Sequence, residues 1–129
     1  MNHREWTILR KVIDEAEALG LMLNGVDEAA FLVSEEKTRA VCMTLINIGE
    51  LVKNLDNDFR SENPQVPWKD MAGLRDVAAP GYFTLRMQDI WIYASIEMPM
   101  FASQITQILE SDEKQHPSSE SENKECPPQ

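Results

Sequence analysis

A run of apolar residues at alternating spacings of four and three lies near the centre of this chain. The run comprises Val41, Leu45, Ile48, Val52, Leu55 and Phe59. Side chains three or four positions apart share one face of an α-helix, so the spacing predicts one long helix over residues 35–61. A stripe of this length suits packing along a second long helix. That second helix belongs either to the same chain or to another subunit.

Two residues within the same stretch are unusual for a long helix. Gly49 costs about 1 kcal/mol of helix stability relative to alanine, and a close crossing by another helix at that point would explain its presence. Glu50 adjoins the apolar stripe. Most helical glutamates are solvated, but this one is a candidate for an acid that faces a pocket.

Apolar residues also recur at helical spacing through most of the remaining chain. The pattern predicts further helices over residues 4–23, 28–33, 68–78, 85–97 and 99–110. The expected helix starts are marked by the N-cap candidates Asp27, Ser34 and Thr84, and Pro99 is expected to begin or kink the last helix. We therefore predict an all-α fold, an antiparallel bundle of about five helices within a single domain over residues 1–110.

The final segment, 111–129, differs in composition from the rest of the chain. Its sequence, SDEKQHPSSESENKECPPQ, has no large apolar residue and is rich in Ser, Glu and Pro. Such a segment buries too little apolar surface to offset the entropy of ordering. We expect residues 111–129 to form a disordered acidic tail.

The charge and the cysteine and histidine content narrow the classes of function. The net charge of −10 repels a phosphate backbone at long range, so any RNA contact must be local, and a basic protein partner is favoured. Two cysteines and two histidines show no metal-ligand spacing, so no metal and no cofactor are expected. No apolar run reaches the length needed to cross a membrane. The chain is expected to be cytoplasmic.

The stretch GLRDVAAPGYF, residues 73–83, combines Arg75 and Asp76 with Pro80 and Tyr82 between two apolar helical patterns. Arginine offers a planar fork of donors to phosphate oxygens. A tyrosine hydroxyl can position a phosphate. Alternatively, Arg75 is a helix-end ion pair, Tyr82 a packing residue and Asp76 a solvated acid.

Three segments together resemble the HepT-like family, a branch of the HEPN superfamily. They are KTRAVCMTLINIGELVKNL (37–55), NPQVPWKDMAGLRDV (63–77) and YFTLRMQDIWIYASIEMPMF (82–101), and the resemblance extends over about residues 8–109. It implies a helical bundle that forms a two-fold homodimer. It also implies a toxin of a type VII toxin–antitoxin pair that cleaves RNA without a metal. The implied partner is a nucleotidyltransferase antitoxin that can silence the toxin by transferring AMP to a tyrosine.

The family motif consists of an arginine, a short spacer, a histidine, any residue and a tyrosine. The resemblance assigns the catalytic arginine to Arg75 and the tyrosine, which is also the AMP acceptor, to Tyr82. Pro80 occupies the histidine position. Proline cannot exchange a proton, and loss of a general acid–base costs about 10²–10⁴ in rate. Asp76 is the nearest titratable side chain that could partly replace the histidine, and Glu50 and Asp76 are the candidate pocket acids.

Two functions follow from this departure from the motif. The first is a HepT-type endoribonuclease scaffold in which RNA cleavage is weak or lost. The alternative is a non-enzymatic dimeric module that pairs with the nucleotidyltransferase antitoxin or binds a nucleotide. A third hypothesis, which the sequence supports less, is a purely structural helical dimer.

Overall fold

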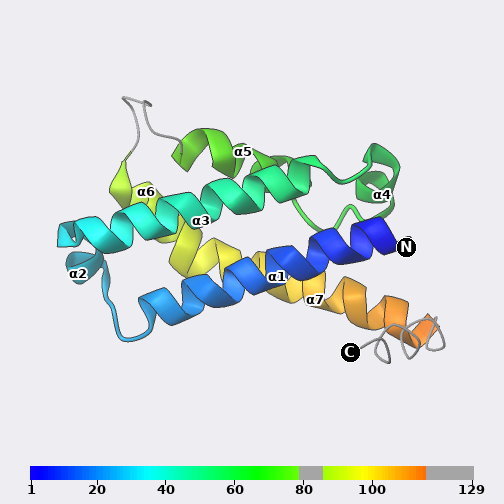
Figure 1. Ribbon diagram of the computed structural model, residues 1–129, viewed down its shortest axis with the longest axis horizontal. Helices are drawn as coiled ribbons and strands as arrows, with labels where there is room; N and C mark the ends of the chain where they lie inside the picture. The colour runs from blue at the N-terminus through cyan, green and yellow to red at the C-terminus, as the bar shows by residue number, and fades with distance from the viewer. Residues whose placement is uncertain (79–85, 116–129) are drawn as a thin grey trace.

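Four helices set the architecture of the computed structural model, which describes residues 1–78 and 86–115. Helix α1 (His3–Leu23) runs antiparallel to α3 (Glu35–Lys53), and α5 (Trp68–Ala78) lies along the other side of α3 (Figure 1). Helix α7 (Met98–Gln115) packs against α1 in the opposite direction. The described residues contain helices and no strand, which confirms the all-α fold class.

Short elements join the long helices. They are α2 (Glu28–Val33), α4 (Asn57–Glu62), α6 (Met87–Ile92) and the π-helical turn η1 (Tyr93–Glu97). The described residues therefore form more helical elements than the five helices expected, because short helices replace parts of the long ones.

The caps of α2 and α3 lie where the sequence predicts them. The side chain of Asp27 accepts a hydrogen bond from the Ala30 N–H at 2.9 Å, and Ser34 Oγ accepts one from the Lys37 N–H at 3.1 Å. Between α1 and α2, Gly25 has a φ of 75°, a left-handed conformation that glycine adopts without steric cost. These local signals fix the tight connection that brings α3 back alongside α1.

The apolar stripe of residues 41–59 is buried within a single chain. Val41, Leu45, Ile48 and Val52 are fully buried in α3, and Leu55 and Phe59 continue the core beyond it. The stripe therefore packs inside this chain, as the first of the two hypotheses predicts, and does not form a subunit interface.

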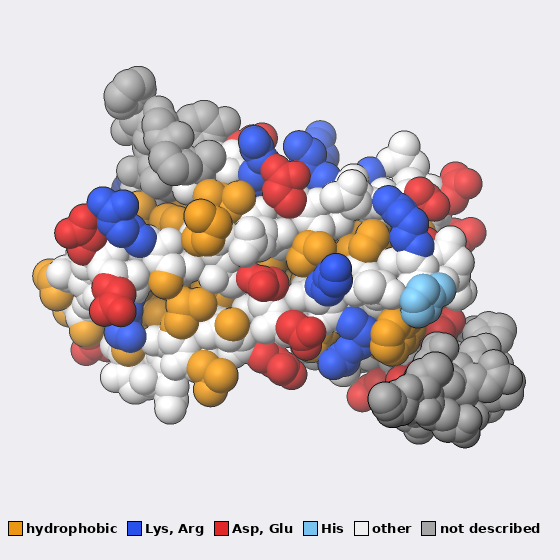
Figure 2. Space-filling model, in the orientation of Figure 1, with side chains coloured by type: hydrophobic (Ala, Val, Ile, Leu, Met, Phe, Trp, Pro, Cys, Tyr) orange, Lys and Arg blue, Asp and Glu red, His pale blue; other side chains and the backbone are white. Residues whose placement is uncertain are grey.

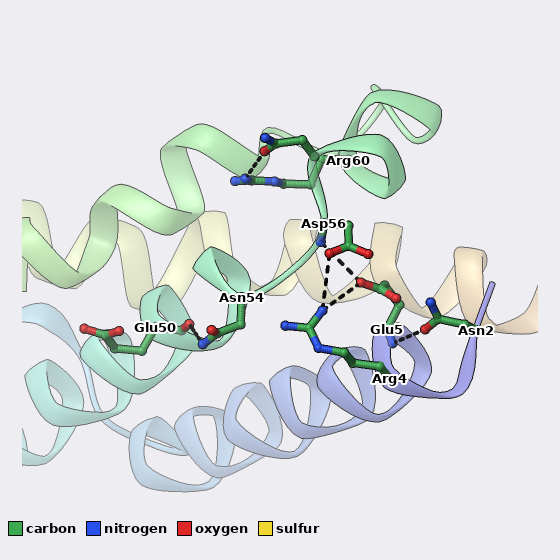
Figure 3. A network of polar contacts seen from close by, with 8 residues as sticks. Asn2, Arg4, Glu5, Glu50, Asn54, Asp56 and Arg60 are labelled. Carbon is green, nitrogen blue, oxygen red and sulfur yellow. Dashed lines mark hydrogen bonds and ion pairs between the residues drawn. The ribbon is translucent and has the colours of Figure 1, made fainter.

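The prediction of one continuous helix over residues 35–61 is wrong. Helix α3 ends at Lys53, where the Asn54 side chain donates a hydrogen bond to the Glu50 carbonyl oxygen at 2.9 Å. Asp56 then adopts an extended conformation and is the N-cap residue of α4, which begins at Asn57. The Asp56 N–H donates to the buried carboxylate of Glu5, and Arg4 approaches both acids (Figure 3). The bond from Asp56 to Glu5 of α1 holds the chain in a bend. The spacing of apolar residues continues unchanged through this bend, so the spacing alone does not reveal it.

The C-terminal half differs from the prediction at two helix boundaries. Helix α6 begins at Met87 after the N-cap position Arg86, two residues later than expected, and the proposed cap Thr84 lies outside the described residues. The last helix, α7, begins at Met98, one residue before Pro99, which agrees with the expectation that Pro99 begins or kinks it. A π-helical turn precedes it, in which the Met98 N–H bonds to the Tyr93 carbonyl oxygen. Because proline lacks an N–H and its ring crowds the carbonyl four residues earlier, a wider turn accommodates it.

Helix α7 continues to Gln115, five residues past its expected end at Glu110. The first residues of the segment predicted to be disordered, 111–115, are therefore helical. The rest of that segment, 116–129, lies outside the described residues.

Helices α3 and α5 meet at Gly49. A Cβ atom on Gly49 would lie 2.7 Å from the backbone nitrogen of Arg75 and 3.1 Å from the carbonyl oxygen of Ala72. Real Cβ atoms do not approach backbone atoms so closely. The close crossing anticipated from this glycine is confirmed.

We expect Gly49→Ala to lower the free energy of unfolding by about 1–3 kcal/mol, because the added methyl group forces α5 away from α3. This loss should outweigh the gain in helix propensity of about 1 kcal/mol. Gly20, in α1, provides the control, since nothing lies within 4 Å of a Cβ placed there. Gly20→Ala should be neutral or stabilising in the same urea titration. Equal effects of the two substitutions would contradict the close-crossing interpretation.

Candidate functional site

The candidate site lies where the last turn of α5 approaches the C-terminal part of α3. Arg75 is in that last turn, and Glu50 projects from α3 directly after Gly49. The Nε–H of Arg75 donates to Oε2 of Glu50, and Nη1 donates to Oδ1 of Asp76 at 3.2 Å. The side chains remain about half exposed, 44% for Arg75 and 48% for Glu50. Both side chains are therefore accessible to solvent.

The two carboxylates raise the pKa of the Arg75 guanidinium, mainly through the hydrogen bond to Glu50 and the attraction of its charge. Arg75 thus stays cationic, since an arginine is not deprotonated in proteins. It cannot act as a proton donor or acceptor. Its chemistry is limited to binding and stabilising negative charge.

A groove between α1 and α3 adjoins Glu50 on the side away from α5. It has a volume of about 400 Å³ and is lined by Lys11, Asp14, Glu15, Asn47, Glu50, Leu51 and Asn54. Figure 3 shows Glu50 near the end of α3 and Asn54 directly after the helix, with the Asn54 side chain bonded back to the Glu50 carbonyl oxygen. Glu50 therefore faces both a groove and the guanidinium of Arg75.

The predicted site residues fall into two groups. The structure brings together Arg75, Glu50 and Asp76, and Asp76 is an exposed acid paired with its neighbour. Pro80 and Tyr82 lie outside the described residues. In the part of the chain that the structure describes, no cluster of three or more His, Cys, Asp or Glu side chains could hold a metal ion. None of the described helices is long and apolar enough to cross a bilayer.

The chain is similar to one family model and to several named proteins. A family model described as "Ribonuclease HepT-like" matches residues 12–108. A protein named "Putative RNase" from Caldanaerobacter subterraneus subsp. tengcongensis is 35% identical over 104 residues, which cover 81% of this chain and 93% of that protein. A "Probable ribonuclease HepT" from Thermococcus cleftensis is 35% identical over 89 residues, covering 67% and 81%. No solved structure matches the chain.

The chain belongs to the HepT-like ribonuclease family. The matched range begins in α1 and ends in α7, so it includes both helices that form the Arg75–Glu50 contact. Family membership thus agrees with the resemblance carried by the motifs at residues 37–55, 63–77 and 82–101.

Arg75 makes little contribution to the stability of this HepT-like fold, because exposed ion pairs contribute little to unfolding free energy. We expect Arg75→Ala to leave the urea midpoint nearly unchanged. The control is the preceding residue, Leu74, which is 1% exposed. Leu74→Ala should cost about 2–5 kcal/mol through lost burial and the resulting cavity. A large destabilisation by Arg75→Ala would assign the arginine a structural role.

Proposed function

We propose that this chain is the cytoplasmic HepT-type member of a type VII toxin–antitoxin pair, with a ribonuclease scaffold whose cleavage activity is weakened by Pro80. The observation that carries the proposal is the exposed Arg75 at the end of α5, held by carboxylates from two helices. It directly precedes the segment that contains Pro80 and Tyr82. An arginine held in this way is suited to bind a phosphate.

Metal-free cleavage of RNA requires three things of a site. The 2′-hydroxyl loses its proton as its oxygen attacks phosphorus, the bond from phosphorus to the 5′-oxygen breaks, and that leaving oxygen gains a proton. The phosphorane formed between these steps carries extra negative charge. Arg75 can stabilise this charge through its remaining N–H donors.

The two proton transfers need a group that titrates near neutral pH. The family motif supplies an imidazole for this task, and Pro80 has no titratable atom. The carboxylates of Asp76 and Glu50 both accept hydrogen bonds from Arg75. The proposed site therefore keeps an arginine suited to a phosphate and has no imidazole at the motif position.

We expect Pro80→His to raise the rate of cleavage of single-stranded RNA by about 10²-fold or more, since it restores a general acid–base group. Pro80→Ala is the matched control, because it removes the proline ring without adding an imidazole. Both variants are incubated with a labelled RNA in buffer containing EDTA, and the products are separated by gel. Equal cleavage by the wild type and Pro80→His would show that another residue performs the proton transfer.

The alternative function is a non-enzymatic dimeric module that pairs with a nucleotidyltransferase antitoxin or binds a nucleotide. Exposed apolar side chains favour a partner or a second copy, because extended apolar surfaces mark interaction sites. The large ones are Met1, Leu21, Val33, Met43, Ile92, Ile96 and Met100. On the face shown in Figure 2, hydrophobic side chains gather toward the end of the bundle that carries α2 and α6. RNA binding without cleavage, even after Pro80→His, would favour this alternative.

Tyr82 is the proposed acceptor of AMP from the antitoxin. The chain has only one other tyrosine, Tyr93. Burial, together with the nearby charges of Glu97, Asp70 and Asp89, raises the pKa of the Tyr93 phenol. Its phenolate, the nucleophilic form, is therefore scarcer than that of an exposed tyrosine.

We expect a nucleotidyltransferase of the antitoxin class, supplied with ATP, to increase the mass of the chain by one AMP group. Tyr82→Phe should abolish the increase, and Tyr93→Phe should leave it intact. Intact-mass spectrometry measures both outcomes. Modification that survives Tyr82→Phe would refute the assignment of the acceptor.

A further inference from the structure

The contact between Glu50 and Arg75 is built into the closest approach of two helices. Glu50 follows Gly49, the position at which the backbone of Arg75 comes too near to allow a side chain. The absence of a Cβ at one residue thus brings the carboxylate of the next within hydrogen-bonding reach of Arg75. Half-exposed ion pairs add little to stability. We therefore look for a role of this contact in the chemistry of the site.

The hydrogen bonds that Arg75 makes to described residues involve two N–H donors of its guanidinium group. The group has five N–H donors. The Nε–H bonds to Glu50, and one Nη1 donor bonds to Asp76. Among the described residues, Nη2 has no hydrogen-bond partner. The edge formed by Nη1 and Nη2 therefore has the donors that bind two phosphate oxygens side by side.

We infer that Glu50 is a positioning residue that turns the Nη1–Nη2 edge of Arg75 toward an RNA phosphate. The inference rests on the proposed function, since it assigns a role within the same site. Glu50 touches neither the phosphate nor the reacting atoms. It acts by restricting the rotamers of a long, exposed side chain through the bond to Nε.

Glu50 also has an opposite effect on an anionic ligand. Its negative charge reduces the attraction of Arg75 for a phosphate. Replacement by glutamine separates the two effects, because a glutamine oxygen still accepts the Nε–H bond without carrying a charge. Replacement by alanine removes the bond and the charge together.

The test measures the affinity of the full chain for a fluorescein-labelled single-stranded RNA of mixed sequence by anisotropy. We expect Glu50→Ala to weaken binding by about tenfold, within the range of coupling between residues in contact. Glu50→Gln should bind within about twofold of the wild type or more tightly. Tighter binding by Glu50→Ala than by the wild type would overturn the inference. It would show that the main effect of Glu50 is to weaken RNA binding through its negative charge.

A double-mutant cycle distinguishes positioning from a general structural effect. Once Arg75→Ala is present, adding Glu50→Ala should cause no further loss of RNA affinity. Glu35 is the matched control, since it pairs with Arg39 at 2.8 Å on the surface of the same helix. Glu35→Ala should leave RNA affinity unchanged.

The failures of the two proposals differ in this experiment. Equal RNA affinity of the wild type and Arg75→Ala would contradict the proposed function, and the role of Glu50 would fall with it. Weaker binding by Arg75→Ala with no change in Glu50→Ala would overturn the positioning role alone. A further loss on adding Glu50→Ala to Arg75→Ala would also overturn it.

Discussion

Helices α3 and α5 approach so closely that a backbone nitrogen of α5 occupies the space where a side chain of α3 would otherwise lie. Gly49 makes this contact possible, and much of the candidate site depends on it. The buried residues Ile48 and Val52 of α3 and Met71 and Leu74 of α5 supply the apolar area that holds the helices together. The polar contact between Glu50 and Arg75 lies at the exposed margin of this packed surface. The packing of the core therefore sets the distance between α3 and α5. That distance places Glu50 within hydrogen-bonding reach of Arg75.

The charge of the chain makes this geometry more important than bulk attraction. A protein with a net charge of −10 does not draw RNA to its surface from a distance. Arg75 also has two carboxylates as neighbours, so its own field is partly neutralised. A phosphate would be held by the direction of a few N–H donors at short range. Under these conditions, the orientation of one guanidinium has a larger share in binding than it would in a basic protein.

The sequence was sufficient to predict features that depend on neighbouring residues. The spacing of apolar residues identified the core face of α3, and the caps at Asp27 and Ser34 are formed by side chains three residues from the N–H groups that they bind. The bend at residues 54–56 could not be predicted in this way, because its anchor, Glu5, is 51 residues away. A glutamate in the first turn of a helix is ordinary at the sequence level. Only the fold reveals that this one is buried against the start of α4.

The same limit applies to the site. Glu50 and Arg75 were each candidates from the sequence, but they are 25 residues apart and no local pattern links them. Gly49 was the one local signal of their proximity, since a glycine inside a helix points to close approach by another element. It indicated a crossing without identifying the partner helix.

Fold and chemistry are separable in this chain, because they depend on different residues. No described core contact requires an imidazole, and the helices that carry Arg75 and Glu50 pack through apolar side chains and one glycine. The proposed loss of proton transfer at Pro80 concerns none of these packing contacts. The scaffold that carries Arg75 is therefore the same whether or not the site cleaves RNA, so the proposed binding to RNA or to an antitoxin can be measured separately from cleavage.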